Sequence, residues 1–318
     1  MSPVGEKSLI ERIRRRVRDG AAVVTGIGDD CAVLRMPAGH QLLVTTDFTL
    51  ENVHFRREWH PPEVVGWRCL TRGLSDIAAM GGEPRAAFLS MALDRGVPQK
   101  WVNRFLAGLL EAAEEFRVPL AGGDTAQSAG GIQADIVVVG SVPKGTAVLR
   151  SGARPGDQIY VTGELGGSAA AIVRMREGKV RAEDYERHFH PTARVEVGRR
   201  LRRRGLASAM IDVSDGLSTD LEHICEESGV GAEIEVAAIP RAQVGRPAQQ
   251  VGFDLALHGG EDYELLFMSA RKIPAKVAGV QVTRIGRITQ GRGMVLIAED
   301  GRRRSLAARG WEHFKGDL

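Results

Sequence analysis

The chain has 318 residues, 43% apolar and 26% charged, with a formal net charge of +3 at pH 7, which is typical of a globular protein with a hydrophobic core and excludes disordered and collagen-like chains. Three widely spaced cysteines form no C-x-x-C pair, which argues against a disulfide framework and a zinc ribbon. Because no apolar run is long enough for a membrane span or a signal core, we expect a cytoplasmic protein.

The first half of the chain is predicted to alternate helices and strands. An amphipathic helix over residues 7–18 precedes a strand at 41–47. Apolar residues then recur at helical spacing from Val64 to Ala78 and from Val102 to Phe116. The run ADIVVVGSVP, residues 134–143, indicates a buried strand.

A domain boundary is predicted near residue 150. The segment SGARPGDQIYVTG, which begins at Ser151, places glycines and a proline between two strand-like runs. Composition of this kind is typical of the connection between two domains. We therefore expect one domain over residues 1–148 and a second over residues 149–318.

The second half repeats the pattern of helices and strands. Helices are expected at 165–176, 192–204 and 216–228, and strands at 209–213, 232–236, 263–268 and twice between 281 and 297. The arginine-rich helix at 192–204 is interpreted as an exposed basic face rather than a nucleic-acid contact, because that is the commoner role of such a run. Both halves also place Ser-Asp before a helix and a carboxylate after a glycine pair. Either two related α/β halves or ordinary caps and turns would explain this.

Carboxylates recur in glycine turns and at the ends of predicted strands. They are Asp29, Asp30, Asp47, Asp76, Asp124, Asp212, Asp215, Glu261 and Asp262. Each alone is explained as a helix cap or turn residue. Gathered in one place, each pair 4 Å apart would repel by about 4 kcal/mol at an effective dielectric constant of 20. Bound cations would relieve that repulsion, and an oxygen-only ligand set favours Mg²⁺.

The common nucleotide-binding fingerprints are missing from the sequence. There is no G-x-x-x-x-G-K-[ST] run, no third glycine that completes Gly26-x-Gly28 into a dinucleotide motif, and no H-R-D or D-F-G pair. Glycine turns with oxygen ligands still suggest phosphoryl transfer. That transfer would have to occur on a less familiar fold.

Seven segments together identify a resemblance. They are GIGDDCAVL, TTDFTLENVHF, LSDIAAMGGEPRAAFLSMAL, LAGGDT, RSGARPGD, IDVSDGLSTDLEHI and GGEDYELLF, in this order. From about residue 5 to its end, the chain resembles the thiamine-monophosphate kinase family. That family belongs to an ATP-binding superfamily with aminoimidazole ribonucleotide synthetase and selenophosphate synthetase. One departure is Asn52, where many members have glycine.

The resemblance implies that the chain transfers the γ-phosphoryl group of ATP to thiamine monophosphate, giving thiamine diphosphate and ADP. It implies several Mg²⁺ ions bound by Asp30, Thr45, Thr46, Asp47, Asp76, Asp124, Asp212 and Asp215. Gly123, Arg150 and Ser214 correspond to ATP contacts, and His54, Glu261 and Trp311 to contacts with thiamine monophosphate. Trp311 could stack on the cationic thiazolium ring or pack on the core, and both interpretations stay open.

The fold implied by the resemblance is α/β (α+β) with two domains. The mixed sheet of the N-terminal domain would form a homodimer interface. The active site would lie in the cleft between this domain and a C-terminal α/β domain. No general base or covalent nucleophile is expected, because a phosphate monoester with a second pKa of about 6 is already largely dianionic at neutral pH. Two alternatives remain: another enzyme of the superfamily with a different acceptor, and a non-catalytic regulator that binds nucleotide or metal.

Overall fold

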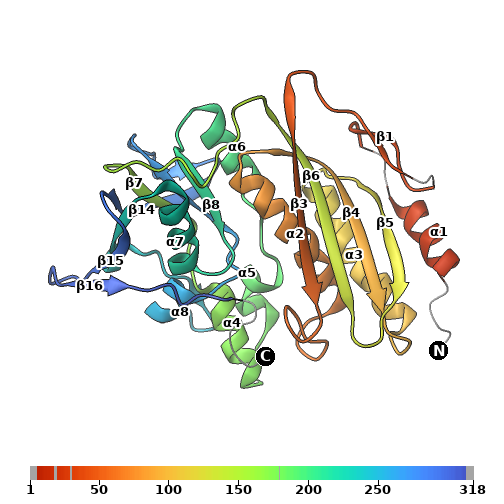
Figure 1. The fold of residues 1–318 in the computed structure, drawn as a ribbon. Coiled ribbons are helices and arrows are strands. Elements are labelled where there is room, and N and C mark those ends of the chain that lie inside the picture. Colours follow the sequence, from red (N-terminus) through yellow and green to blue (C-terminus); the bar gives the residue numbers. More distant parts are fainter. Residues whose placement is uncertain (1–5, 18–19, 29–30, 179, 313–318) are drawn as a thin grey trace. The chain divides into compact units, whose positions relative to one another are not determined.

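The computed structural model describes residues 6–17, 20–28, 31–178 and 180–312, and its chain divides into two units (Figure 1). The N-terminal unit comprises Met1–Ile77 and Gly82–Gly145. The C-terminal unit comprises Thr146–Asp317 together with Ala78–Gly81. The boundary predicted from the sequence lies near residue 150, between residues 148 and 149.

A four-stranded sheet with the order β3-β6-β4-β5 forms the centre of the N-terminal unit. Its strands are β3 (His40–Leu50), β4 (Glu83–Leu93), β5 (Leu120–Gln127) and β6 (Gln133–Pro143). The pairs β3/β6 and β6/β4 are antiparallel, whereas β4/β5 is parallel. The sheet is therefore mixed, as the resemblance predicted.

Two long helices, α2 (Pro62–Ala79) and α3 (Gln99–Glu115), cover one face of this sheet (Figure 1). The apolar stripe of α3 is buried, with Val102, Phe105 and Leu109 fully enclosed. The shorter helix α1 (Glu6–Arg16) lies beside β5, and β1 (Val23–Thr25) pairs with β2 (Val33–Leu34) in a separate ribbon. Side chains of β3 alternate between the helix-covered face and the other face.

The C-terminal unit contains a larger sheet with the order β16-β15-β9-β14-β7-β12-β8. Its strands are β7 (Gln158–Thr162), β8 (Ala209–Val213), β9 (Gly231–Glu235), β12 (Glu264–Ser269), β14 (Val280–Thr289), β15 (Gly293–Ile297) and β16 (Arg303–Leu306), and β13 (Lys276–Val277) pairs with β14. Only β15 and β9 pair in parallel among these strands. A separate ribbon joins β10 (Gln243–Val244) to β11 (Gln249–Gln250).

The helices of the C-terminal unit are short. They are α4 (Gly167–Arg176), α5 (Glu186–Phe189), α6 (Val195–Arg203), α7 (Leu217–Ser228) and α8 (Phe253–His258), with 3₁₀ turns at Ala182–Asp184 and Val236–Ala238. Every residue of β8 and β12 is buried, so these two strands form the centre of the core. Across the described residues, no helix has the length and apolar character needed to cross a membrane.

Candidate functional site

The middle of β3 presents polar side chains to helix α2. The Thr45 hydroxyl donates a hydrogen bond to the carboxylate of Asp76, and Arg72 Nε donates one to Asp47 Oδ1 at 3.1 Å. Thr45 and Asp47 are two residues apart on the strand, and Arg72 and Asp76 are four apart on the helix, so each pair faces the other. Three of the predicted Mg²⁺ ligands, Thr45, Asp47 and Asp76, thus lie together.

Thr46 points to the opposite face of the sheet, because neighbouring residues of a strand alternate. Its hydroxyl donates to Asp135 Oδ1 on β6 at 2.6 Å. Asp135 lies opposite Ser90 of β4, which in turn lies opposite Asp124 of β5. Thr46 and Asp124 therefore share a face and a polar row, although they are separated by two strands.

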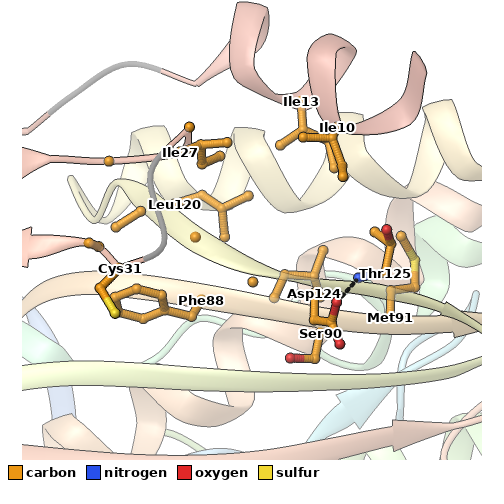
Figure 2. Close-up of a pocket in the computed structure, with 17 residues that line it drawn as sticks. Ile10, Ile13, Ile27, Cys31, Phe88, Ser90, Met91, Leu120, Asp124 and Thr125 are labelled. Atoms are coloured by element: carbon orange, nitrogen blue, oxygen red, sulfur yellow. Dashed lines mark hydrogen bonds between the residues drawn. The ribbon is translucent and has the colours of Figure 1, made fainter. Parts of the chain in front are cut away.

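A cavity of about 710 Å³ borders this row (Figure 2). Ile10 and Ile13 of α1 cover one side of the cavity, and Phe88, Ser90 and Asp124 project from the strands on the other. The lining also includes Gly26, Ile27, Gly28, Cys31, Ala32, Leu89, Met91, Leu120, Ala121, Gly122, Gly123 and Thr125. The volume is typical of a small-molecule site.

Gly123 brings the backbone of β5 unusually close to β4. Its φ is +146°, and a Cβ atom at this position would lie 1.8 Å from the carbonyl oxygen of Leu89. No other residue fits there without displacing the strand. The buried hydroxyl of Thr125, another residue of the lining, has no hydrogen-bond partner among the described residues.

His54 lies in the turn that follows β3. The backbone N–H of Leu50 donates to His54 Nδ1 at 3.0 Å, so the neutral ring carries its proton on Nε2. Asn52 in the same turn has φ +66°, which explains the glycine of many family members: this is the left-handed region, and asparagine tolerates it best among the other residues. The departure at Asn52 is thus compatible with the turn.

In the C-terminal unit, the buried strand β8 ends in a tight acidic turn. Asp212 is its fourth residue, and Ser214, Asp215 and Gly216 follow the strand. The carboxylate of Asp220, from the first turn of α7, accepts the N–H groups of Ser214, Asp215 and Gly216 at 3.1, 3.2 and 3.0 Å. Burial raises the pKa of Asp220 well above its usual range, the charges of Asp212 and Asp215 raise it further, and the backbone donors lower it.

Two predicted substrate contacts are tied to the same turn. The N–H of Glu261 donates to the carbonyl oxygen of Ser214 at 2.7 Å, and the N–H of Trp311 to that of Asp215 at 2.9 Å. The Trp311 side chain is 47% exposed, which argues against the alternative that it packs in the core. The structure therefore brings together Asp212, Ser214, Asp215, Glu261 and Trp311, although they are spread over 100 residues of sequence.

Two further predicted residues lie elsewhere. Arg150 is exposed, and its carbonyl oxygen accepts a hydrogen bond from Ser228 Oγ at 2.8 Å. Asp30, like Asp29, lies outside the described residues. The assignments of both Arg150 and Asp30 stay predictions.

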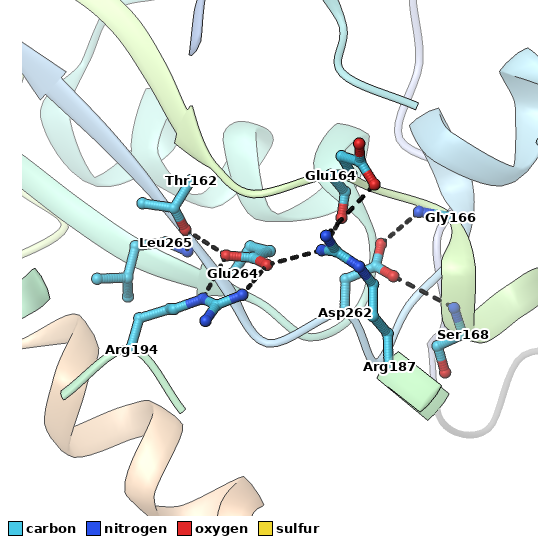
Figure 3. Close-up of polar contacts among 9 residues, drawn as sticks. All are labelled: Thr162, Glu164, Gly166, Ser168, Arg187, Arg194, Asp262, Glu264 and Leu265. Carbon is cyan, nitrogen blue, oxygen red and sulfur yellow. Dashed lines mark hydrogen bonds and ion pairs between the residues drawn. The ribbon is translucent and has the colours of Figure 1, made fainter. Parts of the chain in front are cut away.

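A buried ion-pair network surrounds Glu264, three residues beyond Glu261 (Figure 3). Glu264 is 1% exposed and accepts two hydrogen bonds from Arg194. Arg187 donates to it at 3.2 Å and Thr162 at 2.5 Å. The network joins β7, β12, helix α5 and the residue that precedes α6, so Glu264 is a structural residue of this unit.

Asp262 caps helix α4 from a distant part of the chain (Figure 3). Its carboxylate accepts the N–H groups of Gly166 at 2.7 Å and Ser168 at 3.4 Å. Burial raises the pKa of Asp262 to about 7, even though these two donors lower it. The folded protein therefore holds a proton on Asp262 at a pH at which the unfolded chain has lost it.

Asp262→Asn is expected to reduce the pH dependence of stability. Between the unfolded pKa near 4 and the folded pKa near 7, the native state binds more protons, so wild-type stability falls as pH rises. Relative to wild type, the variant should gain about 3 kcal/mol in free energy of unfolding between pH 5 and pH 8. Urea unfolding at both pH values measures this gain. Asp254→Asn, at an exposed position of α8, is the control, and an equal gain in that variant would contradict the assignment.

The predicted Mg²⁺ ligands offer only oxygen atoms. Within the described ranges, no three His, Cys, Asp or Glu side chains converge into a metal-binding group. Mg²⁺ usually takes only one or two protein carboxylates and completes its shell with phosphates and water, so such a triad is not required. The crowding of Asp212 and Asp215 around Asp220 is an environment that a cation would stabilise. The residues present therefore fit Mg²⁺.

Several residues that organise the site carry no clear signal in the sequence. Asp220 and Glu264 lie inside the quoted segments IDVSDGLSTDLEHI and GGEDYELLF, but nothing local distinguishes them from solvent-facing carboxylates. Arg72 and Asp135 lay outside every glycine turn, and only the strand and helix register brings them to Asp47 and Thr46. A search for polar residues at buried positions of predicted elements could have found Asp220.

Comparison with known proteins gives two domain matches in sequence. Residues 28–142 match the family model of the AIR synthase related protein, N-terminal domain, and residues 154–309 match that of its C-terminal domain. The thiamine-monophosphate kinase of Salmonella typhimurium is 37% identical over 98% of both chains. That of Bacillus subtilis is 34% identical over 98% of this chain and 99% of the relative.

Solved structures show the same similarity. The thiamine-monophosphate kinase of Stenotrophomonas maltophilia superposes with a TM-score of 0.82 at 36% identity, covering 95% of this chain and 98% of that one. AaThiL complexed with AMPPCP and TMP superposes with a TM-score of 0.77 at 33% identity, covering 98% and 97%. The hydrogenase maturation protein HypE, at 21% identity and a TM-score of 0.73, covers 90% of this chain and 89% of its own and shows the fold alone.

Proposed function

The chain is an enzyme of the thiamine-monophosphate kinase family, and from this premise we propose that it transfers the γ-phosphoryl group of ATP to thiamine monophosphate, giving thiamine diphosphate and ADP. The observation that carries the proposal is the turn after β8. Its carbonyl groups at Ser214 and Asp215 hold the backbones of Glu261 and Trp311, the two proposed acceptor contacts of this unit. A metal-binding carboxylate and the acceptor contacts would thus share one rigid support.

ATP binding is supported by the geometry of the N-terminal unit. The cavity beside Gly123 and Asp124 is of a size that a nucleoside can fill, and most of its side chains are apolar. The close approach of β5 to β4 at Gly123 leaves backbone rather than side chain at the cavity wall. The neighbouring AaThiL structure was solved with AMPPCP, which agrees with a nucleotide site on this fold.

Mg²⁺ would be held by the proposed set: Asp30, Thr45, Thr46, Asp47, Asp76, Asp124, Asp212 and Asp215. When bound, the ions would neutralise the charge of the donor and acceptor phosphates. The residues of the chain supply position and charge: Thr45 orients the carboxylate of Asp76, and Arg72 that of Asp47. Asp220 would likewise hold the acidic turn that carries Asp215 in position before substrate arrives.

The transfer itself is proposed to be direct and in line. The acceptor is a phosphate monoester, largely dianionic at neutral pH, so it needs no residue to remove a proton. The barrier is the repulsion between two polyanions, which alignment and charge neutralisation reduce. His54, with its proton on Nε2, could donate a hydrogen bond to the acceptor.

Trp311→Ala is expected to weaken binding of the acceptor and not of ATP. A half-exposed indole face attracts the cationic thiazolium ring, and its loss should raise KM for thiamine monophosphate about tenfold. KM for ATP should not change, and Trp311→Phe should keep most of the affinity because it retains an aromatic face. Steady-state kinetics with each substrate varied in turn measures both constants. Equal losses for the two substrates would exclude the stacking role.

The chain is also proposed to form a homodimer through its N-terminal sheet. Leu42, Val44 and Phe48 project from the same face of β3, and they are 54%, 60% and 58% exposed. Because β3 is also an edge strand, a second copy of this chain would cover both the apolar side chains and the unpaired backbone groups. Sedimentation velocity should show a dimer that Val44→Lys dissociates. A monomeric wild type would overturn the proposal.

The test of the proposed function is a direct assay. Purified protein with ATP, Mg²⁺ and thiamine monophosphate should form thiamine diphosphate and ADP in equal amounts, detected by chromatography. Without acceptor, no exchange of label between ADP and ATP is expected, because no phosphoryl-enzyme forms. Turnover of another phosphorylated acceptor alone would favour a different enzyme of the superfamily, and ATP binding without turnover would favour a regulator.

A further inference from the structure

The segment Arg309–Trp311, which we call the C-terminal strap, lies on the first turn of α7 and on Asp215 before it. Three consecutive backbone N–H groups donate to this turn. Arg309 donates to Ser218 Oγ at 3.3 Å, Gly310 to Thr219 Oγ1 at 2.9 Å, and Trp311 to the carbonyl oxygen of Asp215 at 2.9 Å. Hydrogen bonds at every residue distinguish the strap from a chain end that merely rests on the surface.

The strap also lies too close to the turn for any residue except glycine at its centre. A Cβ atom at Gly310 would lie 2.2 Å from the carbonyl oxygen of Asp215 and 2.5 Å from Thr219 Oγ1. Both obstacles belong to the turn that carries the proposed metal ligand Asp215. Any side chain at position 310 would therefore lift the strap and the tryptophan that follows it.

The turn beneath the strap is itself held in place. Ser218 is fully buried, and its hydroxyl oxygen lies 2.8 Å from Nδ1 of His258 at the end of α8. Ser218 Oγ therefore accepts the N–H of Arg309 and is hydrogen-bonded to His258 Nδ1 at the same time. The strap thus connects through Ser218 to the helix that leads into Gly259 and Glu261.

We propose that Thr219, Ser218 and Gly310 are positioning residues that hold the Trp311 indole in place for the thiazolium ring of the acceptor. This inference rests on the proposed function. A tryptophan on an unanchored segment would lose conformational freedom when substrate binds, whereas the backbone of Trp311 is already held by hydrogen bonds. The backbones of Trp311 and Glu261 are both hydrogen-bonded to this turn, at Asp215 and Ser214, so the two proposed acceptor contacts share one support. Acceptors without a cationic ring would bind more weakly.

The first test compares two substitutions of Thr219. Thr219→Val keeps the shape and removes the hydroxyl that Gly310 N–H uses, and it should raise KM for thiamine monophosphate about three- to tenfold, with kcat and KM for ATP unchanged. Thr219→Ser restores the hydroxyl and should restore KM. Equal KM values in the two variants would overturn the inference.

The second test is a double-mutant cycle. Gly310→Ala should raise KM for thiamine monophosphate about as much as Trp311→Ala. The double variant should have a KM no higher than either single variant, because all three variants lose the same contact between the Trp311 indole and the thiazolium ring. Additive losses would show that Gly310 acts on something other than Trp311 and would overturn the inference. The variants' melting temperatures are compared to confirm that each is folded during the assay.

A fluorescence measurement separates this inference from the proposed function. The fluorescence of Trp311 is obtained by subtracting the spectrum of Trp311→Phe. In Thr219→Val without substrate, this fluorescence should shift to longer wavelength and be quenched more strongly by acrylamide. If wild type makes no thiamine diphosphate, the proposed function fails and this inference fails with it. If wild type is active while Thr219→Val changes neither KM nor the Trp311 emission, only the strap inference fails.

Discussion

Asp76→Asn is expected to lower kcat/KM for thiamine diphosphate formation about a thousandfold while leaving the fold intact. The substitution keeps the shape of the side chain and an oxygen for the Thr45 hydroxyl, but it removes the negative charge proposed to hold Mg²⁺. Loss of metal-based charge stabilisation of about 4 kcal/mol corresponds to a factor of about 10³ in rate. The coupled release of ADP, measured over a range of Mg²⁺ concentrations, should show partial recovery at high Mg²⁺.

Asp94→Asn is the matched control for this prediction. Asp94 is a carboxylate of the same unit that accepts the N–H of Gly96 at 2.7 Å and pairs with Arg57 at 3.8 Å, outside the proposed metal set. Its substitution should change kcat/KM by less than twofold, because Asp94 does not belong to the proposed metal or substrate contacts and an asparagine oxygen can still accept the Gly96 N–H. Near-normal turnover of Asp76→Asn would contradict the proposal that Asp76 binds Mg²⁺. Asp30→Asn is expected to behave like Asp76→Asn.

Glu264→Ala is expected to have the largest effect on stability. Glu264 is almost fully buried and accepts hydrogen bonds from Arg194, Arg187 and Thr162 (Figure 3). Removal of the carboxylate leaves the guanidinium of Arg194, itself only 18% exposed, without its counter-charge. Removing one partner of a buried ion pair costs about 3–5 kcal/mol. Urea unfolding should show that decrease in the free energy of unfolding.

Glu164→Ala provides the comparison for Glu264→Ala. Glu164 pairs with the same Arg187 at 3.3 Å, but its side chain is 39% exposed, so water can replace it. The expected loss is below about 1 kcal/mol. Should Glu264→Ala fail to fold, Glu264→Gln, which keeps the Thr162 contact, should fold with an intermediate loss. Similar stabilities for Glu164→Ala and Glu264→Ala would mean that burial does not govern this network.

All the helices except the short α5 and α8, and about half of the strands, could be predicted from the sequence because their apolar residues repeat with a clear period. The stripe of α3 is one example, and the fully buried strand β8 is another. Strands β4 and β5 were not predicted. In β4 the helix formers Ala, Leu and Met hide the strand alternation, and in β5 the pair Gly122 and Gly123 lowers strand propensity. Both strands form through pairing with distant segments, which local patterns do not contain.

The residues of the candidate site could be predicted from the sequence, but their positions relative to one another could not. The quoted segments, in their order, led to the family, which the comparisons confirmed. They did not distinguish Thr45, which faces α2, from Thr46, which faces the cavity side of the sheet. That difference follows from the pairing of β3 with β6 and from the helix that covers one face.

By itself, then, the sequence determined the family, the oxygen-only character of the proposed metal ligands and the residues to test, because these depend on residue types and their order. The tertiary structure alone decided that Glu264 and Asp262 are structural, that Asp220 supports the acidic turn, and that Trp311 is anchored on that turn. Asp215 and Trp311 are 96 residues apart in the chain (311 minus 215), and no local pattern relates them. Their contact forms only when α7 and the C-terminal strap pack together, since burial and hydrogen bonding are properties of the folded chain.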